Sequence, residues 1–171
     1  MQLKALAIAL FAALPSCTVL ADVQRVSQLG DELRASLTDM QSVLDAYEGN
    51  YAGLASIQGA LSRTRKTVDK CEASLANSPS FTSEESASVA NNTEEVTTML
   101  RETLNTASVK VPMIKAKRMD GMARRMLQPA YEQDMRYTRA LQAKLRPEDA
   151  EAVAPMIKDS MDAYEALFRS L

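Results

Sequence analysis

The chain has 171 residues and a formal net charge of −2. This length suffices for one domain with a hydrophobic core, and the mildly acidic balance argues against a general nucleic-acid-binding protein. The absence of histidine, with only two cysteines, excludes Ser-His-Asp and Cys-His catalysis, the Glu-x-x-His ligands of di-iron bundles and an ordinary zinc site. We therefore expect no conventional enzyme, no metal and no cofactor.

The first 21 residues have the pattern of a secretory signal peptide. Lys4 precedes an apolar run over residues 5–14, which is too short to span a bilayer, and residues 19–21 suit a signal peptidase. We expect a secreted mature chain over residues 22–171, without a transmembrane segment because no later apolar run is long enough. Two alternatives are a buried first helix and lipidation of Cys17, because residues 14–17 resemble a bacterial lipoprotein box.

Two long amphipathic helices are predicted over residues 23–47 and 52–76. In both, apolar residues recur at spacings of three and four, which places them on one helix face, and Gly49-Asn50 ends the first helix. Cys71 lies on the apolar stripe of the second helix and has no partner once Cys17 is removed. We interpret it as a small buried hydrophobe; the alternative is an exposed thiol that pairs with another protein.

A third helix is predicted after the loop at residues 77–80. Thr82 and Glu85 have the spacing of a capping box, and Pro112 is expected to end or bend the helix. The acidic pairs in this helix are interpreted as capping and solvated residues rather than a glycosidase pair. Asn91 begins an N-glycosylation sequon, which serves as an acceptor only if its helix face is exposed.

The remaining chain is predicted to form a connector and two further helices. Residues 113–128 are interpreted as a kinked or short helical connector, because Asp120-Gly121 is a turn signal. Pro129 suits the first position of a fourth helix, where its missing N–H costs nothing, and the segment at 147–149 begins a fifth. No strand-like alternation occurs, so we predict an all-α bundle of about five amphipathic helices.

Methionines and basic residues gather in the same part of the sequence. Flexible methionine side chains can line a pocket that adapts to an irregular apolar guest; the alternative is ordinary core filling. The candidate ligand-binding residues are Met99, Leu104, Met119, Met122, Met126, Met135 and Leu141. Nearby cations either form a solvated face or contact a carboxylate or phosphate head group; they are Lys115, Lys117, Arg118, Arg124 and Arg125.

The order and spacing of these features resemble the fungal hydrophobic surface-binding protein A family, also called cell wall galactomannoproteins, over residues 22–171. The shared pattern includes Asp45-Ala46-Tyr47-Glu48-Gly49, Pro129-Ala130-Tyr131 and Pro147-Glu148-Asp149. The resemblance implies a five-helix fold, secretion to the medium or cell wall, and adsorption to hydrophobic surfaces. It also implies fatty acids as ligands and a secreted esterase as a partner.

The chain departs from these relatives in its content of Met and Arg, where they are rich in Ser, Thr and Ala. It also has no Ser/Thr-rich stalk and no C-terminal hydrophobic anchor signal. We therefore expect release into the medium rather than covalent attachment to the wall.

Two functions remain open at this point. The first is binding of an apolar ligand or surface by the bundle, and the second is a secreted effector-like module that binds another protein. A ligand carrier requires a cavity, whereas an interaction module would have a solid core and an exposed apolar patch of several hundred Å².

Overall fold

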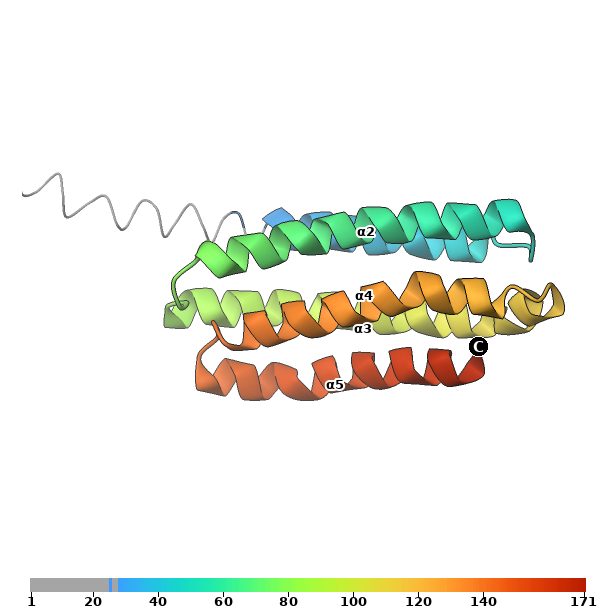
Figure 1. Ribbon diagram of the computed structural model, residues 1–171. Helices are drawn as coiled ribbons and strands as arrows, with labels where there is room; N and C mark the ends of the chain where they lie inside the picture. Colours follow the sequence, from blue (N-terminus) through green and yellow to red (C-terminus); the bar gives the residue numbers. More distant parts are fainter. Residues whose placement is uncertain (1–24, 26–27) are drawn as a thin grey trace, which may run out of the picture.

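The computed structural model describes residue 25 and residues 28–171. This part contains an N-terminal helix over residues 28–45 and four further helices: α2 (Tyr51–Asn77), α3 (Ser83–Ala116), α4 (Asp120–Gln142) and α5 (Pro147–Ser170). No strand occurs in the described residues, and consecutive helices run in opposite directions (Figure 1). The prediction of an all-α bundle of about five helices is thus confirmed. The predicted signal peptide, the cleavage before Asp22 and Cys17 lie outside the described residues.

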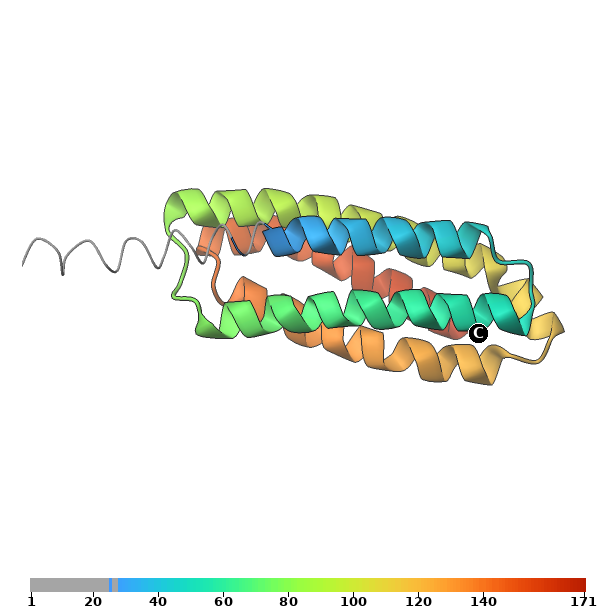
Figure 2. The same cartoon turned by 90° about the horizontal axis from the view of Figure 1, so that it is seen from above.

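The helices pack in pairs along the length of the bundle. α3 packs against α5, and α2 packs against α4, while the N-terminal helix lies beside both α2 and α3 (Figure 2). Ion pairs join this helix to α2 through Asp39 and Arg63, 2.5 Å apart, and through Glu32 and Lys70, 3.0 Å apart. These contacts close the bundle around a common interior.

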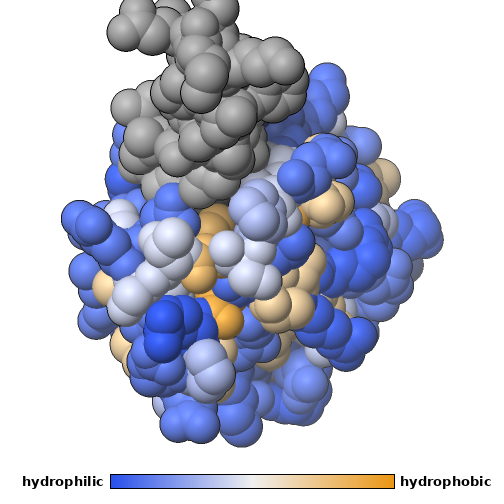
Figure 3. Space-filling view, turned by 90° about the vertical axis from the view of Figure 1, so that its left-hand side faces the viewer, coloured by the Kyte–Doolittle hydropathy of each residue, from blue (hydrophilic) through white to orange (hydrophobic). Residues whose placement is uncertain are grey.

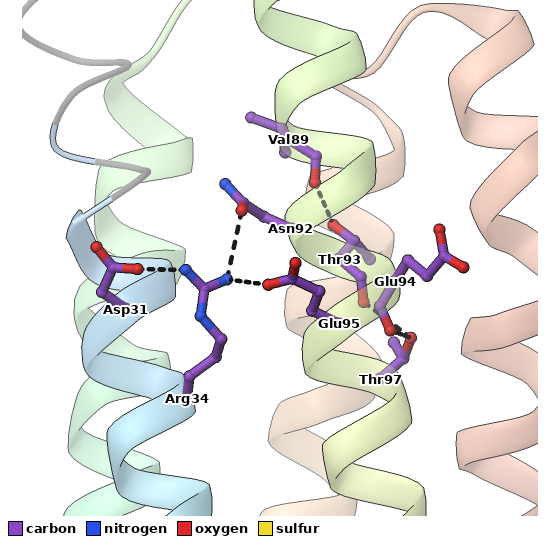
Figure 4. A network of polar contacts seen from close by, with 8 residues as sticks. All are labelled: Asp31, Arg34, Val89, Asn92, Thr93, Glu94, Glu95 and Thr97. Atoms are coloured by element: carbon purple, nitrogen blue, oxygen red, sulfur yellow. Dashed lines mark hydrogen bonds and ion pairs between the residues drawn. The ribbon is translucent and has the colours of Figure 1, made fainter.

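A polar network also joins the N-terminal helix to α3 (Figure 4). The Arg34 guanidinium pairs with Asp31 on its own helix, donates to Asn92 Oδ1 at 3.3 Å and lies 3.0 Å from Glu95 Oε2. Asn91, next to this network, is exposed. A glycan at this position would therefore extend into solvent, and glycosylation of Asn91 stays a prediction.

The hydrophobic core contains buried clusters toward both ends of the bundle. One buried cluster, near the α3–α4 turn, includes Leu54, Ile114 and Met119. Another, at the opposite end, includes Leu75 and Phe81. Figure 3 shows the latter end, which is covered mainly by hydrophilic residues around a small apolar area. A third cluster, of Met40, Leu44 and Ala60, joins the N-terminal helix to α2.

Side chains cap the starts of α2 and α3. The Asn50 side chain caps α2 by accepting from the Gly53 backbone N–H at 2.7 Å. At the start of α3, the Thr82 hydroxyl accepts from the Glu85 N–H while the Glu85 carboxylate accepts from the Thr82 N–H, at 3.4 and 2.8 Å. The predicted capping box is confirmed.

The predicted connector over residues 113–128 is wrong. α3 continues through Pro112 to Ala116, and α4 already begins at Asp120, so Pro129 lies inside α4 rather than at its start. A proline inside a helix costs about 3 kcal/mol. Burial of Val111 and Ile114 on either side of Pro112 offsets that cost for α3.

Arg118 forms the turn between α3 and α4. Its φ of 56° is left-handed, its N–H donates to the Lys115 carbonyl at 2.9 Å, and the Met119 N–H donates to the Ile114 carbonyl at 3.1 Å. These two bonds are the pattern of a Schellman C-cap, which usually places glycine in the left-handed position. The Asp120-Gly121 turn signal therefore falls just after the turn, within the first turn of α4.

Cys71 is buried on α2, which confirms its interpretation as a core residue. Burial, followed by the nearby charge of Glu32, raises the pKa of the Cys71 thiol to about 11. The reactive species is the thiolate, so we expect native protein at pH 8 to react with a maleimide far more slowly than urea-unfolded protein. Time-resolved mass spectrometry of the adduct checks this; equal rates in both states would contradict the buried position.

Candidate ligand-binding site

All five helices contribute to an interior cavity of about 120 Å³, referred to below as the central cavity. The N-terminal helix contributes Leu33, Leu37, Met40 and Leu44. Since a helix rises 1.5 Å per residue, this wall extends roughly 16 Å along the bundle. The central cavity is therefore long and narrow.

A second interior space of about 70 Å³, the end cavity, lies toward the α3–α4 turn. It shares wall residues with the central cavity, among them Leu44, Ile57, Ala107 and Leu167. The two spaces therefore adjoin.

Most polar side chains in the central cavity are already satisfied by the protein. The hydroxyls of five wall residues donate to backbone carbonyls: Thr64, Thr97, Thr103, Thr138 and Ser160. Hydroxyls bonded in this way present little polarity to a guest. The walls are therefore suited to an apolar molecule.

The outer surface between α2 and α4 carries a hollow of about 450 Å³, referred to below as the α2–α4 groove. It shares Leu61 and Arg65 with the central cavity, so the two spaces adjoin. Arg125 also lines the groove. Neither arginine has an ion-pair partner among the described residues, which leaves both available to an anion at the mouth of the cavity.

Gln133 holds Arg65 in place between the groove and the cavity. The Arg65 Nε donates to Gln133 Oε1 at 3.1 Å, and Gln133 Nε2 donates to the Arg65 carbonyl at 2.9 Å and to Asp69 Oδ1 at 2.5 Å. Gln133 is 1 % exposed, and a buried amide with its bonds satisfied is rigid. These bonds tie α4 to α2 next to the mouth.

Asp134 brings a carboxyl group into the wall of the central cavity. The Tyr164 hydroxyl donates to Asp134 Oδ2 at 2.5 Å, and no cation pairs with the carboxylate within the described part of the chain. Burial raises the pKa of Asp134 to about 6, although the bond from Tyr164 acts in the opposite direction. Burial, followed by the charge of Asp134, holds the pKa of Tyr164 well above its usual range.

The structure brings together only some of the predicted site residues. Leu104 lines the central cavity, while Met122, Met126 and Arg125 line the α2–α4 groove. The other predicted residues lie outside both spaces. Met119 and Leu141 are packed in the two end clusters, Met99 and Met135 are half-buried elsewhere, and the exposed cations outside the groove are Lys115, Lys117, Arg118 and Arg124.

Sequence reasoning did not single out Arg65, Asp134, Tyr137 or Tyr164 as site residues. A signal was present for Asp134, which occupies the same face of α4 as Ala130 and Tyr137 because residues three and four apart are neighbours on a helix. A carboxylate on an apolar stripe is unusual unless it is paired. No group of His, Cys, Asp and Glu suited to a metal ion occurs in the described part of the chain, and none of the helices described there is long and apolar enough to cross a membrane.

Comparisons with known proteins identify a family and a shared fold. The family model described as hydrophobic surface binding protein A matches residues 18–143. No curated protein sequence matches the chain.

Three solved structures share the fold at low sequence identity. Ligand binding domain 1 of the Penicillium marneffei MP1 protein, complexed with arachidonic acids, is 13% identical with a TM-score of 0.80, over 87% of this chain and 97% of that one. AFMP4P in complex with palmitic acid is 15% identical with a TM-score of 0.78, over 85% and 98% of the two chains. Ligand binding domain 2 of MP1, complexed with multiple arachidonic acids, is 12% identical with a TM-score of 0.78, over 88% and 94%.

Proposed function

The chain belongs to the hydrophobic surface binding protein A family, and on that premise we propose that it is a secreted, non-enzymatic lipid-binding protein. Its central cavity takes the acyl chain of a fatty acid, and the α2–α4 groove takes the carboxylate. The observation that carries this proposal is the long apolar cavity that adjoins a groove with two unpaired arginines. Solved proteins of the same fold are described in complex with arachidonic and palmitic acids.

The central cavity has the elongated shape of an acyl chain, but without a ligand its volume is small. About 120 Å³ is close to the roughly 150 Å³ apolar cavity that stays dry and binds benzene, and it is below the roughly 300 Å³ of a typical ligand pocket. A long acyl chain therefore requires the central and end cavities to join. Burial of each methylene contributes about 0.8 kcal/mol, which favours this widening.

The charge distribution favours entry of the tail and exclusion of the head group. An ionised carboxylate inside the cavity would meet Asp134, whose own charge is already disfavoured by burial. A carboxylate in the groove would instead meet Arg65 and Arg125. We infer that the fatty acid binds with its tail inside and its head in the α2–α4 groove.

The head-group contact is tested by a matched pair of neighbouring arginines. Arg125 lines the groove, whereas Arg124 is exposed outside it. We expect Arg125→Ala to weaken palmitate binding about threefold to fivefold at low salt, and less at high salt because exposed ion pairs are weak and screened. Arg124→Ala is the control and should change affinity less than twofold. Isothermal titration at two salt concentrations measures both; equal effects would contradict the groove as head site.

The tail contact is tested at the junction of the two cavities. Ala107→Phe fills space that both cavities border, and we expect at least tenfold weaker palmitate binding by a protein with an unchanged helical spectrum. Ala52→Phe, at an exposed position of α2, is the control. Unchanged affinity of the Ala107 variant would place the tail elsewhere.

The protein acts outside the cell, associated with the cell wall or released, and carries out no reaction, so p-nitrophenyl ester hydrolysis should not exceed that of heat-treated protein. A secreted esterase is not part of the proposal, because no observation on the described residues supports one. The interaction-module alternative is disfavoured by the cavity and by the few large hydrophobic side chains exposed in the described part of the chain: Tyr51, Val109, Met113 and Met122.

A further inference from the structure

Two polar groups in the wall of the central cavity lack a full set of hydrogen bonds. The Asp134 carboxyl receives a bond on Oδ2 alone, from Tyr164. The Tyr137 hydroxyl has no partner within residues 28–171. Tyr137 lines the central cavity together with Asp134 and follows it by three positions, so the two side chains are neighbours on one face of α4.

Apart from the terminal nitrogens of Arg65, the other polar side chains of the cavity wall have hydrogen-bond partners. Arg65 and Gln133 bond each other, and the threonine and serine hydroxyls bond backbone carbonyls. Buried polar groups are normally hydrogen-bonded, and those that are not require an explanation. Among the described residues, the fully buried side-chain atoms without a partner are Gln41 Oε1 and the Tyr47 hydroxyl. In the cavity wall, the half-buried Asp134 and Tyr137 add one acceptor, the free oxygen of Asp134, and one group that can donate, the phenol of Tyr137.

We propose that Asp134 and Tyr137 form a recognition site for an uncharged hydroxyl group carried by a lipid, with long-chain alcohols as the ligand class. A hydroxyl donates to the free oxygen of Asp134 and accepts from the Tyr137 phenol, which satisfies both residues at once. A fatty carboxylate offers no proton to Asp134 and repels its charge. The inference rests on the proposed function, since it assumes that the same cavity holds an acyl chain.

The two ligand classes would then bind in opposite directions. A fatty acid leaves its carboxylate in the α2–α4 groove beside Arg125. A long-chain alcohol places its hydroxyl at Asp134, inside the bundle, and directs its tail toward the end cavity. Each class therefore depends on a polar residue that the other does not use.

Binding of 1-dodecanol and dodecanoate to the full mature chain tests this reciprocal dependence. Hydrogen bonds to a buried charged group contribute enough that we expect Tyr137→Phe and Asp134→Leu each to weaken dodecanol binding about tenfold. Dodecanoate affinity should change less than twofold in Tyr137→Phe and should not fall in Asp134→Leu. Arg125→Ala should weaken dodecanoate binding and should change dodecanol affinity less than twofold. Isothermal titration gives the affinities, and native mass spectrometry verifies one bound lipid.

Tyr131→Phe is the matched control, because Tyr131 lies on α4 and packs edge-on against Tyr164 and Phe168 outside the cavity wall. If Asp134→Leu fails to fold, the dodecanol affinity of Tyr137→Phe alone tests the inference, because this variant loses a single oxygen atom and keeps the packing of the ring. Equal weakening of both ligands by Tyr137→Phe, or no weakening of dodecanol, overturns the inference while leaving fatty acid binding intact. Failure of both ligands to bind wild type overturns the proposed function as well.

Discussion

Replacement of Asp134 by Asn is expected to stabilise the protein at pH 7.5 by about 2–3 kcal/mol, because it removes an unpaired buried charge. Burial raises the folded-state pKa of Asp134 from 3.8 to about 6. An asparagine keeps an oxygen that can accept the bond from Tyr164. The substitution therefore removes the cost of the buried charge while retaining the contact.

The same residue gives the wild type a defined pH dependence. Because the folded pKa lies above the unfolded one, folded protein takes up a proton first as the pH falls, so the free energy of unfolding rises between about pH 6 and pH 4. This contribution is complete below about pH 3.8 and is lost as the pH rises through about 6.

Urea unfolding of wild type and Asp134→Asn from pH 4 to pH 8 measures the effect as a difference between two curves. Exposed groups such as Glu148, whose pKa is lowered by hydrogen bonds to its carboxylate, contribute equally to both proteins and cancel. The difference should be largest above pH 7 and small near pH 4. Parallel curves would show that the Asp134 charge has no cost in the fold.

Leu75→Ala is expected to cost about 3–5 kcal/mol, a large share of the 5–15 kcal/mol by which a typical domain is stable. Leu75 is 2 % exposed and packs in the end cluster with Phe81, Leu141 and Val153. A truncation there opens a new void in a closely packed region. Buried leucines of this cluster therefore provide much of the stability of the bundle.

Leu104→Ala is expected to cost less, about 2–3 kcal/mol, because one side of Leu104 already faces the central cavity and lacks partner atoms. Val109→Ala, at a position 75 % exposed, is the control and should change stability by about 0.5 kcal/mol or less. Urea unfolding with equal m-values gives all three numbers. A larger cost at Leu104 than at Leu75 would contradict an open cavity beside Leu104.

The helices that carry complete local signals could be predicted from the sequence. α2 lies between a capping asparagine and the loop that starts at Ser78, α3 begins with a capping box, and α5 begins with proline at its first position. Cys71 was placed correctly because the stripe of one helix determines which face is buried. These features depend on residues within one or two turns of each other, so sequence alone contains their causes.

The α3–α4 region required tertiary information. Proline and glycine favour breaks locally, yet α3 runs through Pro112 and α4 through Pro129. Packing of Ile114, Met119 and Ala123 in one cluster stabilises helix on both sides of a turn made by Arg118. Contacts between distant segments outweigh a local penalty here, and a single sequence does not show their strength.

The binding site shows most clearly which features the sequence predicts and which require the tertiary structure. The absence of histidine excluded imidazole catalysis and an ordinary zinc site, and apolar stripes predicted a bundle with a hydrophobic interior. Whether that interior is filled or hollow depends on the fit of side chains from five helices. A filled and a hollow interior differ by only a few methyl groups, and this difference leaves no periodic pattern in the sequence. Asp134, Tyr137 and Tyr164 meet in the cavity wall because α4 and α5 are packed together, so only the tertiary structure brings them into one site.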